Sequence, residues 1–102
     1  MSQNGPIDLT EGQLAIVRDL LNRYLPGATA WAYGSRVKGT ARRTSDLDLV
    51  VFVDETSRSR VADLKDAFDE SDLPFPVDLH VWDEIPIEFQ EQISSRYVEI
   101  RA

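Results

Sequence analysis

Two aspartates separated by a single residue, Asp46 and Asp48, open an apolar segment of this 102-residue chain. Side chains alternate between the two faces of a β-strand, so both carboxylates would lie on one face, roughly 7 Å apart between Cα atoms. Such a pair can bind one divalent metal cluster, which relieves the repulsion between the two charges. The pattern is common, however, and it also fits exposed acids at the start of a strand, or a turn that Asp46 caps with Ser45.

A Gly-Ser pair, Gly34-Ser35, precedes these acids by ten intervening residues and directly follows a segment typical of a strand. Glycine allows the backbone to approach a ligand closely, and the N–H groups of a strand-to-helix turn can bind phosphate together with a serine hydroxyl. Gly-Ser alone is weak evidence. The whole pattern of strand, Gly-Ser, ten residues and Asp-X-Asp is more specific, because it places a phosphate site and a metal site on neighbouring strands.

A third acid, Asp78, lies between two apolar residues in another alternating segment, which we expect to be mostly buried. A buried carboxylate needs a partner. A metal ion shared with Asp46 and Asp48 would provide one, and so would an ion pair with an arginine. His80 would lie on the same face as Asp78, where we expect it to support the site or the fold and not to bind the metal itself.

The charge of the chain is uneven, although its net value is −7. The segment between Gly34 and Ser45 contains no acid and four basic residues: Arg36, Lys38, Arg42 and Arg43. A small basic segment in an acidic protein suits a compact anion such as a triphosphate better than a nucleic acid, which needs a broad basic face. Arg36 and Lys38 are therefore candidates for nucleotide binding, although basic side chains in a polar loop can also simply be solvated.

The available ligands restrict the metal. The chain has no cysteine and a single histidine, which excludes disulfides, thiolate nucleophiles and cysteine-based zinc sites. Oxygen ligands favour hard ions such as Mg²⁺, with Mn²⁺ as a substitute. No apolar run approaches the roughly 20 residues that span a bilayer, and the polar start lacks the hydrophobic stretch of a signal peptide, so we expect a cytoplasmic protein without a membrane partner.

Hydrophobic periodicity predicts the elements that position these residues. Thr10 and Gln13 have the spacing of a capping box, at the start of a helix that Pro26-Gly27 would end. Later helices are expected over 57–70 and from about 86, and strands over 28–33, 46–53, 75–82 and 97–100. We therefore expect one domain, residues 1–102, of the α/β (α+β) class, with helices packed against a mixed sheet of three or four strands.

Three segments, residues 31–40, 45–49 and 77–79, resemble the polymerase-beta-like nucleotidyltransferase superfamily. Within it they are similar to the minimal nucleotidyltransferases that pair with a small helical HEPN-type protein. The likeness covers nearly the whole chain and implies that superfamily's small fold.

For the site, the resemblance implies that Gly34, Ser35 and the neighbouring backbone hold a triphosphate. It also implies that two Mg²⁺ ions are held by three carboxylates: Asp46, Asp48 and Asp78.

The resemblance implies a reaction as well: transfer of a nucleotide, AMP from ATP, to a hydroxyl acceptor by in-line displacement at the α-phosphorus. A HEPN-type partner would supply the acceptor, and the chain would act as its antitoxin. Trp31, Trp82 and Tyr97 are expected to be core or interface aromatics. Two other functions stay open: a non-catalytic module that blocks its partner by occlusion, and a metal-dependent phosphohydrolase, which would commonly need further His or Asp ligands.

Overall fold

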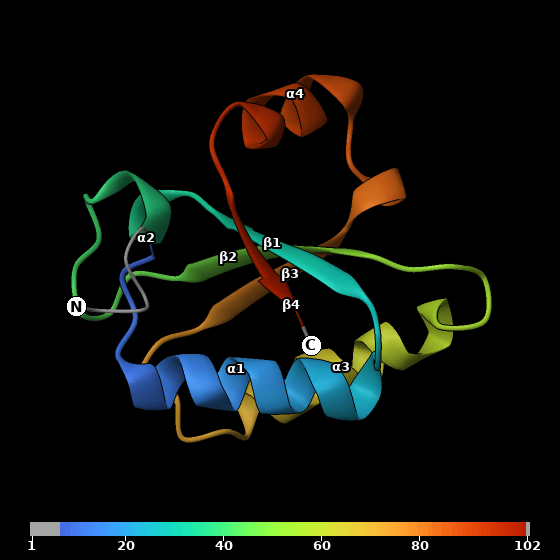
Figure 1. Ribbon diagram of the computed structural model, residues 1–102, viewed down its shortest axis with the longest axis horizontal. Coiled ribbons are helices and arrows are strands. Elements are labelled where there is room, and N and C mark those ends of the chain that lie inside the picture. The colour runs from blue at the N-terminus through green and yellow to red at the C-terminus, as the bar shows by residue number, and fades with distance from the viewer. Residues whose placement is uncertain (1–6, 102) are drawn as a thin grey trace.

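The computed structural model describes residues 7–101, which fold around one sheet (Figure 1). The polar start, residues 1–6, lies outside this range. In chain order the elements are α1 (Glu11–Tyr24), β1 (Thr29–Tyr33), α2 (Ser35–Lys38), β2 (Leu47–Phe52), the 3₁₀ turn η1 (Arg58–Arg60), α3 (Val61–Asp69), β3 (Val77–Val81), the 3₁₀ turn η2 (Trp82–Glu84), α4 (Ile87–Ser95) and β4 (Val98–Arg101). The predicted order of elements is confirmed, with boundaries that differ by a few residues. None of the helices in the described part of the chain is long and apolar enough to cross a membrane.

The sheet contains four strands in the order β3-β2-β1-β4. β1 pairs antiparallel with β2 and with β4, whereas β2 and β3 run parallel. A parallel pair requires a crossover connection, and α3 lies within it. The mixed four-stranded sheet that the sequence predicts is therefore confirmed, and β2 is one of its two central strands.

The capping box fixes the start of α1. The Thr10 hydroxyl accepts a hydrogen bond from the Gln13 backbone N–H, and the Gln13 side chain accepts one from the Thr10 N–H, both at 3.0 Å. These reciprocal bonds satisfy two backbone donors near the helix start. The apolar stripe of α1 is thereby aimed at the sheet, where it packs with α3 in the main core (Figure 1).

The two faces of the sheet have different roles. One face is apolar on every strand and is covered by α1 and α3, so that Leu49 and Val51 are completely buried. The opposite face carries a smaller apolar cluster of Tyr33, Val50 and Ile93, beneath α4. Phe89 of α4 packs against this cluster. Ile87 is 65% exposed.

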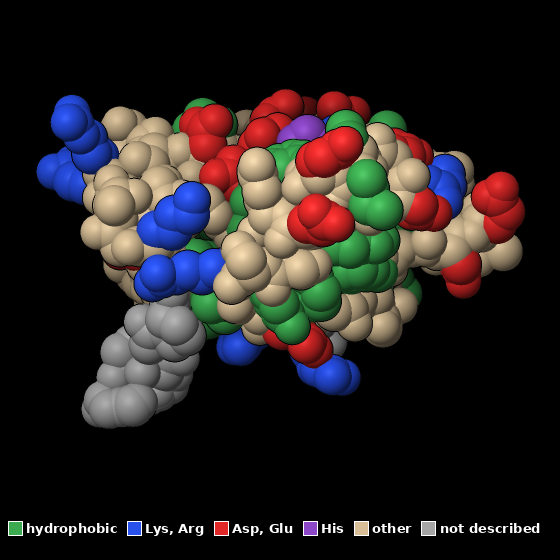
Figure 2. All heavy atoms as spheres, turned by 90° about the horizontal axis from the view of Figure 1, so that it is seen from above, with side chains coloured by type: hydrophobic (Ala, Val, Ile, Leu, Met, Phe, Trp, Pro, Cys, Tyr) green, Lys and Arg blue, Asp and Glu red, His purple; other side chains and the backbone are tan. Residues whose placement is uncertain are grey.

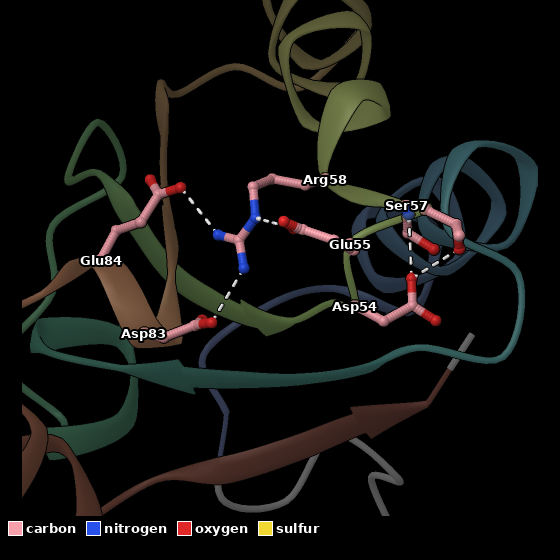
Figure 3. A network of polar contacts seen from close by, with 7 residues as sticks. Asp54, Glu55, Ser57, Arg58, Asp83 and Glu84 are labelled. Carbon is pink, nitrogen blue, oxygen red and sulfur yellow. Dashed lines mark hydrogen bonds and ion pairs between the residues drawn. The ribbon is translucent and has the colours of Figure 1, made fainter.

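A network around Arg58 connects the loop after β2 to η2 (Figure 3). The Arg58 guanidinium donates hydrogen bonds to Asp83 at 2.9 Å and to Glu84 at 2.8 Å. Nearby, a carboxylate oxygen of Asp54 accepts a bond from the Ser57 N–H at 2.9 Å. Exposed ion pairs contribute little free energy, typically below about 1 kcal/mol each. The network therefore fixes the path of the chain into α4 more than it adds stability.

Candidate active site

Three side chains form a row across the open face of the sheet, one from each of three neighbouring strands. Tyr33 on β1 is in register with Asp48 on β2, and Asp48 is in register with Asp78 on β3. Register partners on neighbouring strands are separated by about 5 Å between Cα atoms. The two aspartates therefore bring their carboxylates together at the end of the sheet that is nearest to α2.

The pairing perturbs the ionisation of Asp48. Partial burial, together with the negative charges of Asp78 and Asp46, raises the pKa of Asp48 to about 6, and His80 opposes this increase. Asp46 lies one residue before β2 and is exposed, so it contributes as a neighbouring charge. Without a cation, the folded chain therefore favours the protonated form of Asp48 more than the unfolded chain does. This carboxyl therefore stabilises the metal-free fold fully below about pH 4, and the contribution is lost as the pH rises through about 6.

The expectation that Asp78 is buried is wrong. Its side chain is 53% exposed, because β3 is an edge strand and the row lies at the open end of the face. Its ion-pair partner among the described residues is His80 and not an arginine, with Nε2 of His80 3.2 Å from Oδ2 of Asp78. His80 thus lies on the face expected for it, beside the carboxylate.

Gly34 is adapted to this row by its backbone and by its missing side chain. Its φ of 80° and ψ of −153° lie in a region that is essentially restricted to glycine. A Cβ atom at this position would overlap with the Oδ2 atom of Asp48 and lie 3.2 Å from its Cγ atom. Glycine therefore allows the Asp48 carboxylate to lie directly against the turn that begins α2.

Tyr33 forms the floor beside the carboxylates. Its side chain is buried, and its ring contacts the edge of Phe89 with centroids 5.7 Å apart. Burial, followed by the charges of Asp48 and Asp78, raises the pKa of its hydroxyl far above the usual value. The hydroxyl is therefore protonated at neutral pH and adds no negative charge to the row.

A pocket of about 300 Å³ opens above the row. One wall comes from the strand ends and α2 and contains five residues: Tyr33, Gly34, Lys38, Asp48 and Asp78. Ser35 lies between Gly34 and Lys38 as the first residue of α2, where backbone N–H groups have no partner within the helix. Of the predicted site residues, the pocket thus brings together Asp48, Asp78, Gly34 and Lys38. Asp46 and Ser35 are next to it in the sequence but do not line it.

The second wall comes from α4, which the sequence analysis did not include in the site. It contributes Phe89, Gln92 and Ile93, and the residue directly after the helix, Arg96, is the fourth. Their spacing of three, four and seven residues from the first places them on one helical face. That periodicity was available in the sequence, but it indicates only a face and not what the face covers.

Arg36, the second predicted basic residue, does not line this pocket. Its side chain is buried, and its guanidinium lies 4.0 Å from the centroid of the Phe75 ring. It donates hydrogen bonds to the carbonyl oxygens of Asp8, Arg42, Arg43 and Ser45, at 2.8 to 3.2 Å. The geometry does not support the interpretation of Arg36 as a nucleotide ligand, because its donors are used to hold the loop that leads into β2.

The donor set fits a magnesium ion that is only partly coordinated by protein. No three acidic or histidine side chains among residues 7–101 converge closely enough to hold a metal by themselves. Asp48 and Asp78 are nevertheless direct register neighbours, and burial together with the charge of Asp78 raises the pKa of Asp48. Mg²⁺ is commonly bound by one or two carboxylates, with phosphate oxygens and water as its other ligands.

Comparison with known proteins agrees with the fold. The family described as polymerase beta, nucleotidyltransferase matches residues 17–100. The chain is 43% identical over 102 residues to a Haemophilus influenzae protein described as "Probable protein adenylyltransferase MntA", covering 99% of this chain and 90% of the relative. The chain therefore belongs to the polymerase beta nucleotidyltransferase family, and within it to the minimal nucleotidyltransferases.

A solved structure supports the same fold. It is described as "Crystal structure of the toxin-antitoxin with AMP-PNP" and superposes with a TM-score of 0.60. The match covers 84% of this chain and 70% of that chain, at 23% sequence identity. At this identity the likeness concerns the fold alone; together with the family match, it confirms the predicted polymerase-beta-like architecture.

Replacing Gly34 by alanine should separate the turn from the carboxylate. We expect Gly34→Ala to cost about 1–3 kcal/mol of unfolding free energy through backbone strain. Nucleotide transfer should fall on the order of a hundredfold, because the added methyl group displaces the Asp48 carboxylate. Gly39→Ala is the matched control, since Gly39 also has a positive φ of 82° but no atom within 4 Å of an added Cβ. Equal losses of transfer in both variants would contradict the close-contact explanation.

Arg36 offers a test of its structural role. Arg36→Met keeps much of the side-chain volume but leaves several partly buried carbonyl oxygens without their donors, so we expect a loss of about 3 kcal/mol in chemical denaturation. Arg36→Lys should recover little of this, because an ammonium group lacks the planar fork of donors. A stable Arg36→Met protein that had lost only nucleotide affinity would instead support the original sequence interpretation.

Proposed function

We propose that this chain transfers AMP from ATP to a hydroxyl group on a partner protein. The observation that carries the proposal is the register pair Asp48 and Asp78, held against the glycine turn of Gly34 at the edge of one pocket. Membership of the nucleotidyltransferase family supports the class of reaction. The relative from Haemophilus influenzae, described as a protein adenylyltransferase, supports AMP as the transferred group and a protein as the acceptor.

In this proposal Asp48 and Asp78, with Asp46 beside them, would hold two Mg²⁺ ions. When bound, such ions polarise the phosphate oxygens and lower the pKa of an acceptor hydroxyl. Because Mg²⁺ can take most of its other ligands from phosphate and water, the absence of a three-carboxylate cage within residues 7–101 does not oppose this assignment.

The residues around the carboxylates would hold the nucleotide. The backbone of Gly34 and Ser35 contacts the triphosphate at the start of α2, and Lys38 neutralises part of its charge from the same pocket wall. The acceptor hydroxyl then loses its proton to solvent as its oxygen forms a bond to the α-phosphorus. The bond from that phosphorus to the bridging oxygen breaks, and pyrophosphate leaves on the opposite side. Tyr33, protonated beneath the carboxylates, excludes water from the floor.

An aromatic cluster gives the partner a surface to contact. Trp31 stacks on Tyr97 with ring centroids 3.7 Å apart, and Trp82 contacts the edge of Trp31 at 5.3 Å. Tyr97 is 39% exposed, and the cluster belongs to the same sheet face as Asp48. Figure 2 looks onto the α4 side of the molecule, where hydrophobic side chains are open to solvent between acidic ones. A HEPN-type helical protein docked here would bring its acceptor hydroxyl near the pocket. It would then be the substrate of this chain, which acts as the antitoxin.

Two labels on ATP separate the candidate reactions. The chain is incubated with Mg²⁺, the product of the neighbouring gene and ATP labelled at the α- or the γ-phosphate. We expect the α-label to appear on the partner protein, with release of pyrophosphate, and the γ-label to stay off it. A partner that is bound and inhibited without any label would support the occlusion alternative. Release of inorganic phosphate without transfer would support a phosphohydrolase.

Removing one carboxylate at a time tests the assignment of the acids. Asp48→Asn and Asp78→Asn should each lower transfer by more than about a hundredfold. The matched control, Asp72→Asn, alters an exposed acid outside the pocket and should leave transfer unchanged.

Thermal denaturation distinguishes lost ligands from lost folding. Without metal and above pH 6, Asp48→Asn should be as stable as wild type or more so, because the variant lacks a carboxylate whose ionisation the fold opposes. Wild type should gain about 2.7 kcal/mol from Mg²⁺ and ATP at a hundredfold excess over Kd, and the variants much less. If both variants are destabilised without metal and transfer persists, the aspartates are structural.

A further inference from the structure

Arg96 at the end of α4 is the basic residue in the second wall of the pocket. It is exposed, and it follows the last helical residue, where its backbone N–H still bonds to the Ile93 carbonyl at 3.1 Å. From this position the side chain reaches α2 on the other wall, with its Nη2 atom 3.5 Å from the carbonyl oxygen of Val37. The side chain therefore spans the pocket beside the turn that is proposed to hold phosphate.

The guanidinium of Arg96 has donors to spare, in contrast to that of Arg36. Within residues 7–101 its side chain makes one hydrogen bond, to the carbonyl of Val37, and that bond is at the long limit. Arg36 donates to four different carbonyl oxygens from a buried position. Within residues 7–101, Arg96 has no carboxylate within ion-pair distance. An arginine with five N–H donors in a fixed fork is thus open to an anionic ligand.

The charges around the pocket are arranged to suit a metal-bound polyphosphate. Asp48 and Asp78 provide two negative charges on one side. Lys38 and Arg96 provide two positive charges, one on each wall, and Lys38 likewise has no carboxylate partner in the described part of the chain. A cation would be attracted to the aspartates, and the phosphate groups beyond it to the two bases.

We propose that Arg96 binds the β- and γ-phosphates of the nucleoside triphosphate, opposite Lys38, and so makes the pocket selective for triphosphates over monophosphates. The inference rests on the proposed nucleotide transfer and adds to it a residue on α4 that the Gly-Ser and aspartate motifs do not include. Because guanidinium and phosphate form paired, charge-assisted hydrogen bonds, the contact also fixes the orientation of the leaving pyrophosphate.

Calorimetric titration of ATP, ADP and AMP in Mg²⁺ tests this residue without requiring the partner protein. Arg96→Ala should weaken ATP binding about ten- to a hundredfold and leave AMP binding within about twofold, because AMP lacks the phosphates that Arg96 contacts. Arg96→Gln keeps a donor for the Val37 carbonyl but removes the charge, so it should show the same loss for ATP. Arg96→Lys should recover part of the affinity.

Arg23→Ala is the matched control, because Arg23 is an exposed arginine on α1, against the other face of the sheet. It should bind all three nucleotides as wild type does. The inference is overturned if wild type binds ATP and the Arg96 variants match it. It is also overturned if Arg96→Ala weakens ATP and AMP equally, or if Arg96→Gln restores full affinity, since Arg96 would then act only through Val37. If wild type binds none of the nucleotides, the proposed function itself fails, and the inference with it.

Discussion

The repulsion between Asp48 and Asp78 is the constraint on which the rest of the site depends. The parallel register of β2 and β3 makes the two acids direct neighbours, and partial burial makes the charge on Asp48 costly enough to raise its pKa to about 6. A fold normally avoids such a pair, or separates it by one residue of register. Here the register cannot slip, because a shift of one residue would move Leu47 and Leu49 out of the main core. Burial of the apolar face of β2 thus fixes the register that keeps Asp48 beside Asp78.

Two residues outside β2 and β3, Gly34 and Arg36, support this arrangement. Gly34 leaves room for the Asp48 carboxylate, and Arg36 fixes the position of the loop that leads into β2. The buried arginine satisfies carbonyl groups from two segments far apart in the sequence, the stretch before α1 and the loop after α2. Arg36 therefore has a structural role, whereas Lys38 and Arg96 line the pocket and can contact a ligand.

The sequence predicts much of this architecture for identifiable reasons. Alternation along β2 places Asp48 on the face that points away from the main core, and the capping box determines where α1 begins. Local periodicity and capping were sufficient to predict these two features. The burial of Asp78 was predicted wrongly, because strand order is not a local property and β3 is an edge strand. Arg36 was misinterpreted for the same reason: only the tertiary structure brings the Asp8 carbonyl to its guanidinium. The α4 wall was missed because a helical face does not indicate what it covers.

The most direct test of the account is the titration of the Asp48 carboxyl carbon by NMR, with and without Mg²⁺ and a non-hydrolysable ATP analogue. In the metal-free protein we predict a midpoint of about 6, with Asp78 and Asp46 as the neighbouring charges responsible after burial. With metal and nucleotide bound, the midpoint should fall by about two pH units or more, because the cation stabilises the charged form. An ordinary midpoint in the free protein that did not move on adding magnesium and nucleotide would contradict the claim that this pair is a cation site enforced by the fold.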